Sequence, residues 1–80
     1  MATGSKSRDP SLTALGAGLK RLRHKADLSQ EQLANLAAVH HNYISALERG
    51  QTNISYKTML RIARALKIPL SRWITATERR

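Results

Sequence analysis

The sequence predicts an all-α domain of five helices, and three observations lead to that class. Apolar residues recur at three- and four-residue spacings along most of the chain, which is the period of a helix with one buried side. Residues that cap helices stand directly before those segments, and no segment alternates like a half-buried strand. Eighty residues can enclose one small core. We therefore expect a folded domain at residues 10–75, a disordered basic leader at residues 1–9 and a frayed tail at residues 76–80.

The first helix is expected to begin within residues 10–14. Asp9 followed by Pro10 suits a cap and a first helical position, although Thr13 is a competing cap. The leucines that follow fall on one side of a helix: Leu12, Leu15, Leu19 and Leu22. Two glycines among them each cost about 1 kcal/mol relative to alanine, so the first turns should fray: Gly16 and Gly18.

The stretch from Ser29 to Gly50 predicts two short helices joined by a tight turn. Ser29 caps the first helix, and Gln32 follows at the capping-box spacing. Apolar residues at helical spacing precede and follow a break at residues 38–40, and Gly50 closes the second helix. Each helix is too short to be stable alone. Their apolar sides must therefore pack on flanking segments, which leaves a polar run outside: His41, Asn42 and Ser45.

Two further helices are expected after a loop at residues 51–54. Ser55 caps the first of them, which carries apolar residues at helical spacing: Met59, Leu60, Ile62, Ala63 and Leu66. Pro69 stops that helix. Ser71 then caps a last short helix that contains Trp73 and Ile74.

The charge balance predicts a polyanionic partner. Fourteen Lys and Arg face five acids, for a formal net charge of +9, and nucleic acid is the leading candidate. The alternatives are a solvated basic surface without a dedicated partner and an anionic membrane, although no single basic amphipathic helix favours the membrane. The absence of cysteine excludes disulfides and thiolate metal sites. No apolar run reaches the ~20 residues of a membrane span and no signal peptide opens the chain, so we expect a cytoplasmic protein.

The segments LSQEQLA at residues 28–34 and ISALERG at residues 44–50 together resemble the helix-turn-helix of the phage lambda and 434 repressor/Cro family. That grouping includes the XRE-type regulators and the restriction-modification controller proteins. The resemblance covers roughly residues 15–74. It implies a lambda repressor-like fold, a bacterial or phage regulator at the nucleoid, and a homodimer on a two-fold DNA operator with half-sites about one helical turn apart.

The resemblance also implies which residues bind DNA. Base edges in the major groove would be contacted from the start of the second short helix by His41, Asn42, Ser45 and Ala46. The DNA backbone would be held by Gln30, Tyr43, Arg49, Thr52, Asn53, Tyr56 and Lys57. Gln30 would either bind a phosphate or brace His41. Tyr43 would either lie on the sugar-phosphate backbone or be partly buried against the following helix. Arg23 and Glu48 would form a structural ion pair.

Two positions depart from the family pattern. Ala38 replaces the usual glycine of the turn, which costs about 1–2 kcal/mol if the backbone there is left-handed. His40 stands where a serine or threonine cap is more usual, so the second short helix should start less firmly. His40 and His41 are expected to point in different directions and therefore not to form a pair of metal ligands.

The surface expected to pair two subunits is C-terminal: Leu70, Trp73 and Ile74. The alternative for Trp73 is a lid over the core of its own chain, because aromatic burial serves either purpose. We expect no catalytic residue, metal, cofactor or small-molecule ligand, since no convergent acid pair or nucleophile–base group is apparent. The alternative function is a protein-interaction module such as the antitoxin of a toxin–antitoxin pair. An RNA-binding factor is less favoured because no array of stacking aromatics is apparent.

Overall fold

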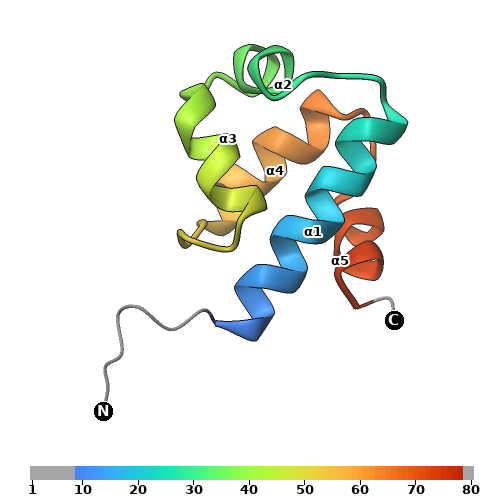
Figure 1. The fold of residues 1–80 in the computed structure, drawn as a ribbon. Helices are drawn as coiled ribbons and strands as arrows, with labels where there is room; N and C mark the ends of the chain where they lie inside the picture. Colours follow the sequence, from blue (N-terminus) through green and yellow to red (C-terminus); the bar gives the residue numbers. More distant parts are fainter. Residues whose placement is uncertain (1–8, 79–80) are drawn as a thin grey trace.

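The computed structural model describes residues 9–78, which form helices without strands, so the predicted all-α class is confirmed. The elements are α1 (Pro10–Lys25), α2 (Gln30–Ala37), α3 (His41–Glu48), α4 (Tyr56–Ala65) and α5 (Leu70–Glu78) (Figure 1). Residues 1–8 of the predicted leader and residues 79–80 of the predicted tail lie outside the described residues.

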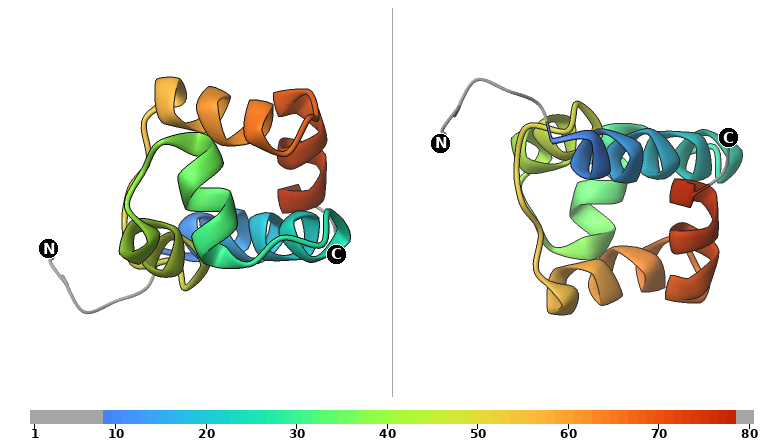
Figure 2. Two further views of the ribbon diagram at one scale, coloured as in Figure 1. Left: turned by 90° about the horizontal axis from the view of Figure 1, so that it is seen from above. Right: turned by 90° about the horizontal axis from the view of Figure 1, so that it is seen from below.

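The long helix α1 and the helix α4 lie on opposite sides of the domain, and the shorter helices connect them (Figure 2). On one side α2 packs against α4 and α3 packs against α1, while α5 closes the other side by packing against α1 and α4. Because α2 and α3 also contact each other, the pair is supported from both α1 and α4. This arrangement provides the flanking support that two such short helices require.

Side chains from all five helices meet in one core. The largest fully buried residues are Leu19, Leu33, Ile44, Leu47, Ile62 and Trp73. Burial of side chains of this kind contributes roughly 1.5–3 kcal/mol each. The core therefore fixes α3 through its apolar side and leaves its other side free.

Trp73 lies inside this core and not at the surface. Its side chain is 0% exposed, and its indole N–H donates to the carbonyl of Leu15 at 3.0 Å. Trp73 therefore has no exposed surface that could contact a second subunit, and its predicted place in a dimer interface is wrong. The large ring instead fills the space between α1 and α5, where its indole N–H has a hydrogen-bond partner. Of the other predicted interface residues, Leu70 is half-buried and Ile74 is 37% exposed.

Two glycines of α1 allow close helix packing, which the expectation of frayed first turns missed. A Cβ atom at Gly16 would lie 2.1 Å from the carbonyl oxygen of Leu47, so the backbones of α1 and α3 touch there. A Cβ atom at Gly18 would lie 3.1 Å from the amide nitrogen of Thr77 in α5. Both glycines are buried. They lower the helix propensity of α1, but only residues without a Cβ atom allow α3 and α5 to pack this closely on α1.

Most predicted helix caps are present. Asp9, and not Thr13, caps α1 by accepting the amide of Ser11 at 2.9 Å. Ser29 and Gln32 form the capping box of α2, and Ser55 accepts the amide of Thr58 at 3.1 Å. The last helix begins at Leu70, one position before the cap expected at Ser71.

The last helix also continues to Glu78, beyond the domain boundary expected at residue 75. Contacts with α1 hold its final turn. The guanidinium of Arg21 donates to the carbonyl of Ala76, and Thr77 packs against Gly18. The local sequence gave no sign of these contacts because their partners lie far away along the chain.

Candidate nucleic-acid interface

The turn between α2 and α3 is built from a left-handed residue and a clamp from α4. Ala38 has φ 59° and ψ 45°, so the left-handed backbone considered from the sequence is present. The amide of Val39 closes the turn by donating to Ala34 at 2.9 Å. From α4, the guanidinium of Arg61 donates to the carbonyls of Ala37 at 3.2 Å and Ala38 at 2.6 Å. These carbonyls end α2 and would otherwise lack partners, so Arg61 is a structural residue of the turn that sequence reasoning missed.

The start of α3 is capped by a histidine. The Nδ1 atom of His40 accepts the amide of Asn42 at 3.0 Å, so this ring does the work of a serine or threonine cap. The rings of His40 and His41 stack with centroids 4.9 Å apart and planes at 23°. The expectation that they point apart is therefore wrong, because His40 lies outside the helix in extended conformation and its ring folds back beside His41. Among the described residues no group of three or more potential ligands surrounds them to hold a metal ion.

Four residues of α3 form an edge that we call the reading edge: His41, Asn42, Ser45 and Ala46. His41 and Asn42 are exposed, and Ser45 and Ala46 are half-buried. The opposite side of the helix carries Ile44 and Leu47, which are fully buried. The predicted base-contacting residues thus share one accessible edge of a helix that is anchored from behind.

A buried ion pair joins the far end of α3 to α1. Arg23 Nε donates to Glu48 Oε2 at 2.6 Å and Arg23 Nη2 donates to Oε1 at 3.0 Å, and the side chains are 8% and 3% exposed. Arg23 also donates to the carbonyl of Leu28 at 2.8 Å. The amide of Gln30 donates to Glu48 at 3.0 Å, so Gln30 braces this carboxylate and not His41. This network fixes the start of α2 and the end of α3 relative to α1.

Tyr43 connects α3 to the loop that follows it. The ring is half-buried against the core, and its hydroxyl donates to the carbonyl of Asn53 at 3.2 Å. Burial raises the pKa of this phenol above its ordinary value of 10.0. Tyr43 therefore holds the loop in place. It is partly buried, but its hydrogen bond goes to the loop, and the two roles considered from the sequence, against the sugar-phosphate backbone or against the following helix, stay predictions.

The remaining predicted backbone-binding residues follow the end of α3 in the chain. Arg49 donates to the hydroxyl of Ser45 and to the side-chain carbonyl of Gln51, the latter at 2.9 Å. Thr52 is half-buried, and three others are exposed in or just after the loop: Asn53, Tyr56 and Lys57. The structure brings all of them to the segments next to α3, whereas Gln30 approaches from the start of α2.

Two short helices joined at a tight turn, with the second helix anchored on its apolar side and open on its polar side, define a helix-turn-helix. A family model described as "Helix-turn-helix" matches residues 19–73. The chain belongs to that family.

Curated relatives include control proteins. Control protein C.SmaI of Serratia marcescens is 33% identical over 61 residues, covering 76% of this chain and 73% of that protein. Control protein C.MunI of Mycoplasma sp is 37% identical over 65 residues, covering 80% and 88%. An uncharacterised HTH-type transcriptional regulator of Sinorhizobium fredii, y4dJ, is 31% identical over 64 residues, covering 80% and 83%.

Solved structures show the same fold. The restriction-modification controller protein C.AhdI of Aeromonas hydrophila is 39% identical with a TM-score of 0.76, covering 78% of this chain and 94% of that one. The clp gene regulator ClgR of C. glutamicum is 27% identical with a TM-score of 0.80, covering 84% and 87%. The five-helix arrangement of this chain is therefore that of the controller proteins, as the resemblance in sequence implied.

Proposed function

We propose that this chain, a DNA-binding regulator of transcription, recognises a specific duplex sequence by placing α3 in the major groove. The observation that carries the proposal is the reading edge, which carries the polar side chains of His41, Asn42 and Ser45 and is exposed or half-buried, while Ile44 and Leu47 on the other side of α3 are fully buried. The major groove admits one helix and presents a distinct donor and acceptor pattern for each base pair. We assign Asn42 to an adenine, to which an amide bonds in a bidentate manner, and His41 to a guanine or a phosphate.

Affinity in this proposal comes mainly from the phosphates. The net charge of +9 attracts DNA, and Arg49, Tyr56 and Lys57 are exposed beside α3. A plot of the logarithm of affinity against the logarithm of salt concentration should have a slope of about −0.9 for each phosphate that the protein neutralises. Gln30, Thr52 and Asn53 would add uncharged contacts to the backbone, which position the helix without selecting sequence.

Two variants separate base contacts from phosphate contacts. Asn42→Ala should lose about 1–3 kcal/mol of binding free energy on a duplex selected from a random pool, because it removes one base contact. The loss of binding free energy on unselected DNA should be far smaller. Lys57→Ala should weaken both duplexes alike and reduce the salt slope by about 1. Fluorescence anisotropy at several salt concentrations measures both effects. Equal losses for Asn42→Ala on selected and unselected DNA would contradict base recognition by this edge.

We further propose that the protein acts as a homodimer on a two-fold operator in the bacterial cytoplasm. Half-sites about one helical turn apart would then be contacted by two copies of α3. Since Trp73 is buried, the surface of α5 available for pairing includes Leu70 and Ile74. Ile74→Arg should convert a dimer into a monomer in light scattering at micromolar concentration, and Arg72→Ala should not. A wild-type chain that scatters as a monomer with and without operator DNA would exclude the dimer.

A further inference from the structure

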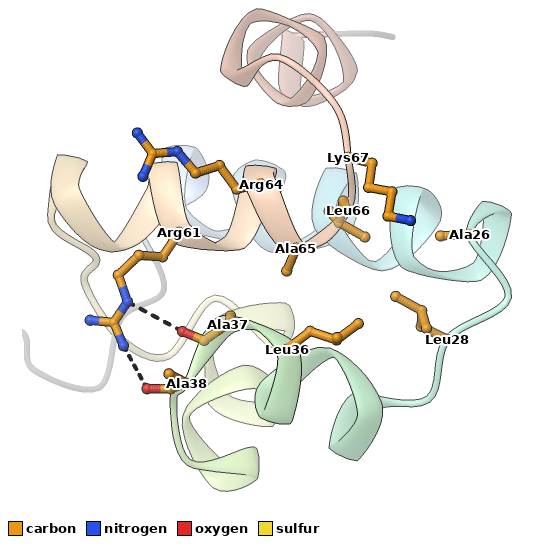
Figure 3. Close-up of a pocket in the computed structure, with 10 residues that line it drawn as sticks. All are labelled: Ala26, Leu28, Leu36, Ala37, Ala38, Arg61, Arg64, Ala65, Leu66 and Lys67. Atoms are coloured by element: carbon orange, nitrogen blue, oxygen red, sulfur yellow. Dashed lines mark hydrogen bonds between the residues drawn. The ribbon is translucent and has the colours of Figure 1, made fainter.

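A groove of about 690 Å³ opens between α2 and the second half of α4 (Figure 3). Its floor is apolar and includes Leu28, Leu36, Ala65 and Leu66. Leu36 is 60% exposed, and its side chain points along the groove toward Leu28 (Figure 3). Leu36 is the one exposed large aliphatic side chain of the lining, and the half-buried Leu28 and Ala65 extend its apolar surface. A contiguous apolar surface bordered by polar residues is typical of an interaction site. None of the residues that line the groove belongs to the reading edge or to the proposed backbone contacts.

The groove is bordered by positive charge. Arg61 stands at one end, tied to the turn carbonyls, and Lys67 stands at the other end near Ala26, while Arg64 extends from the outer side of α4 (Figure 3). The lining contains no acidic residue among those that the structure describes. An occupant must therefore be apolar where it meets the floor and anionic where it meets the rim.

We propose that this groove binds an acidic amphipathic helix of a partner protein. Two helices form its long walls, and a third helix can lay apolar side chains on the floor in the way that helices commonly dock into grooves. Alanines at positions 26, 37 and 65 allow its side chains to approach closely. Carboxylates on its flanks would meet Lys67 and Arg61 at the two ends of the groove, which is the complementarity that selects one partner over another.

Charge and polarity disfavour two other occupants. A second copy of this chain brings a net charge of +9 and only five acids, of which Glu48 is already held in the ion pair with Arg23. A DNA backbone would meet the cations but would leave the apolar floor unmatched. The proposal is separate from the proposed function, because no residue that lines the groove is among the residues proposed to contact DNA.

The direct test uses a designed peptide as the probe. A helical peptide of roughly 15 residues, with leucines on one side and glutamates flanking them, is titrated into the full-length chain and followed by calorimetry and by amide chemical shifts. The proposal expects saturable binding with shifts centred on Leu36, Ala37, Ala65 and Lys67. A peptide with lysines in place of the glutamates should not bind.

Matched variants distinguish this groove from general attraction to a basic protein. Leu36→Gln should weaken the affinity for the peptide by about tenfold or more, because it removes an apolar contact from the floor of the groove. Lys67→Glu should weaken it clearly more than Lys20→Glu, which changes the net charge equally from an exposed position on α1. Leu36 and both lysines are exposed, so these variants should keep the circular dichroism and melting behaviour of the parent chain.

Three results would overturn the proposal. Equal effects of Lys67→Glu and Lys20→Glu on peptide affinity would show that net charge alone drives binding, and would reject the site. Shifts confined to α3 and residues 51–57 would place the peptide on the proposed DNA-binding surface. Saturable shifts in the groove with dodecanoate or with a short DNA duplex, but none with the acidic peptide, would assign the groove to another class of ligand.

Discussion

Replacing Arg23 by methionine should bring the domain to the edge of unfolding. Arg23 makes two hydrogen bonds to Glu48, at 2.6 and 3.0 Å, and one to the carbonyl of Leu28 at 2.8 Å. After the change, the carboxylate of Glu48 would keep only the amide of Gln30 at 3.0 Å. Its side chain is 3% exposed, so water cannot replace the lost guanidinium without opening the contact between α1 and α3.

The expected loss is large compared with the stability of such a domain. Removing one partner from a buried ion pair typically costs about 3–5 kcal/mol. At roughly 0.05–0.15 kcal/mol per residue, a chain of eighty residues has a free energy of unfolding of about 4–12 kcal/mol. The single variant thus loses about a quarter of that free energy of unfolding or more. Replacing both partners by methionine removes the unpaired charge and should recover most of the loss.

Urea denaturation of four proteins tests this reasoning: the parent chain, Arg23→Met, Glu48→Met and the double variant. The chain has a single tryptophan, and because Trp73 is fully buried between α1 and α5 its fluorescence reports loss of the core. The four free energies of unfolding give the coupling energy of the pair. Single variants that each cost less than about 1 kcal/mol, or a double variant that loses the sum of both, would refute a buried pair whose members depend on each other.

Two further predictions concern the turn and the loop on either side of α3. Ala38→Gly should stabilise the domain by about 1 kcal/mol in urea denaturation, because Ala38 has φ 59° and glycine adopts this conformation without strain. The control Ala26→Gly, at an exposed position with φ −83°, should destabilise the domain by about 0.5–1 kcal/mol. A change of the same sign in both variants would contradict a strained turn. Burial raises the pKa of Tyr43 in the folded state above the ordinary value of 10.0, so the phenol ionises at lower pH in the unfolded chain. The stability contributed by the neutral phenol is therefore fully present below pH 10.0 and is lost as pH rises through the pKa of the folded state. Tyr43→Phe should flatten that part of the alkaline decline measured by urea midpoints between pH 8 and about 11, and an unchanged decline would show that other groups cause it.

Features of the fold that depend on local sequence could be predicted from it. The helical spacing of apolar residues placed all five helices, and the caps at Asp9, Ser29 and Ser55 were recognisable because each bonds within its own first turn. The ion pair of Arg23 and Glu48 joins distant positions. It could be expected only through the family resemblance, since spacing alone does not pair residues so far apart.

Features that depend on contacts between helices escaped prediction. The two bonds from Arg61 to the turn require α4 to lie beside the end of α2, and an exposed arginine on an amphipathic helix gives no local sign of that role. Gly18 was interpreted by its helix propensity, although its value lies in the approach of α5. For Trp73 both burial and pairing were physically reasonable, and only the packing of α5 against α1 distinguishes them.

The contact at Gly16 has a consequence for how such a domain can change its target. A methyl group there would stand 2.1 Å from Leu47 O. The backbones of α1 and α3 are therefore in direct contact, and no side chain at residue 16 fits between them. In the proposed function, substitutions along the exposed edge would alter which bases are preferred while the helix keeps its angle. A single added carbon at residue 16 would instead displace α3 as a unit, and would misalign every proposed base contact without altering one residue that makes them.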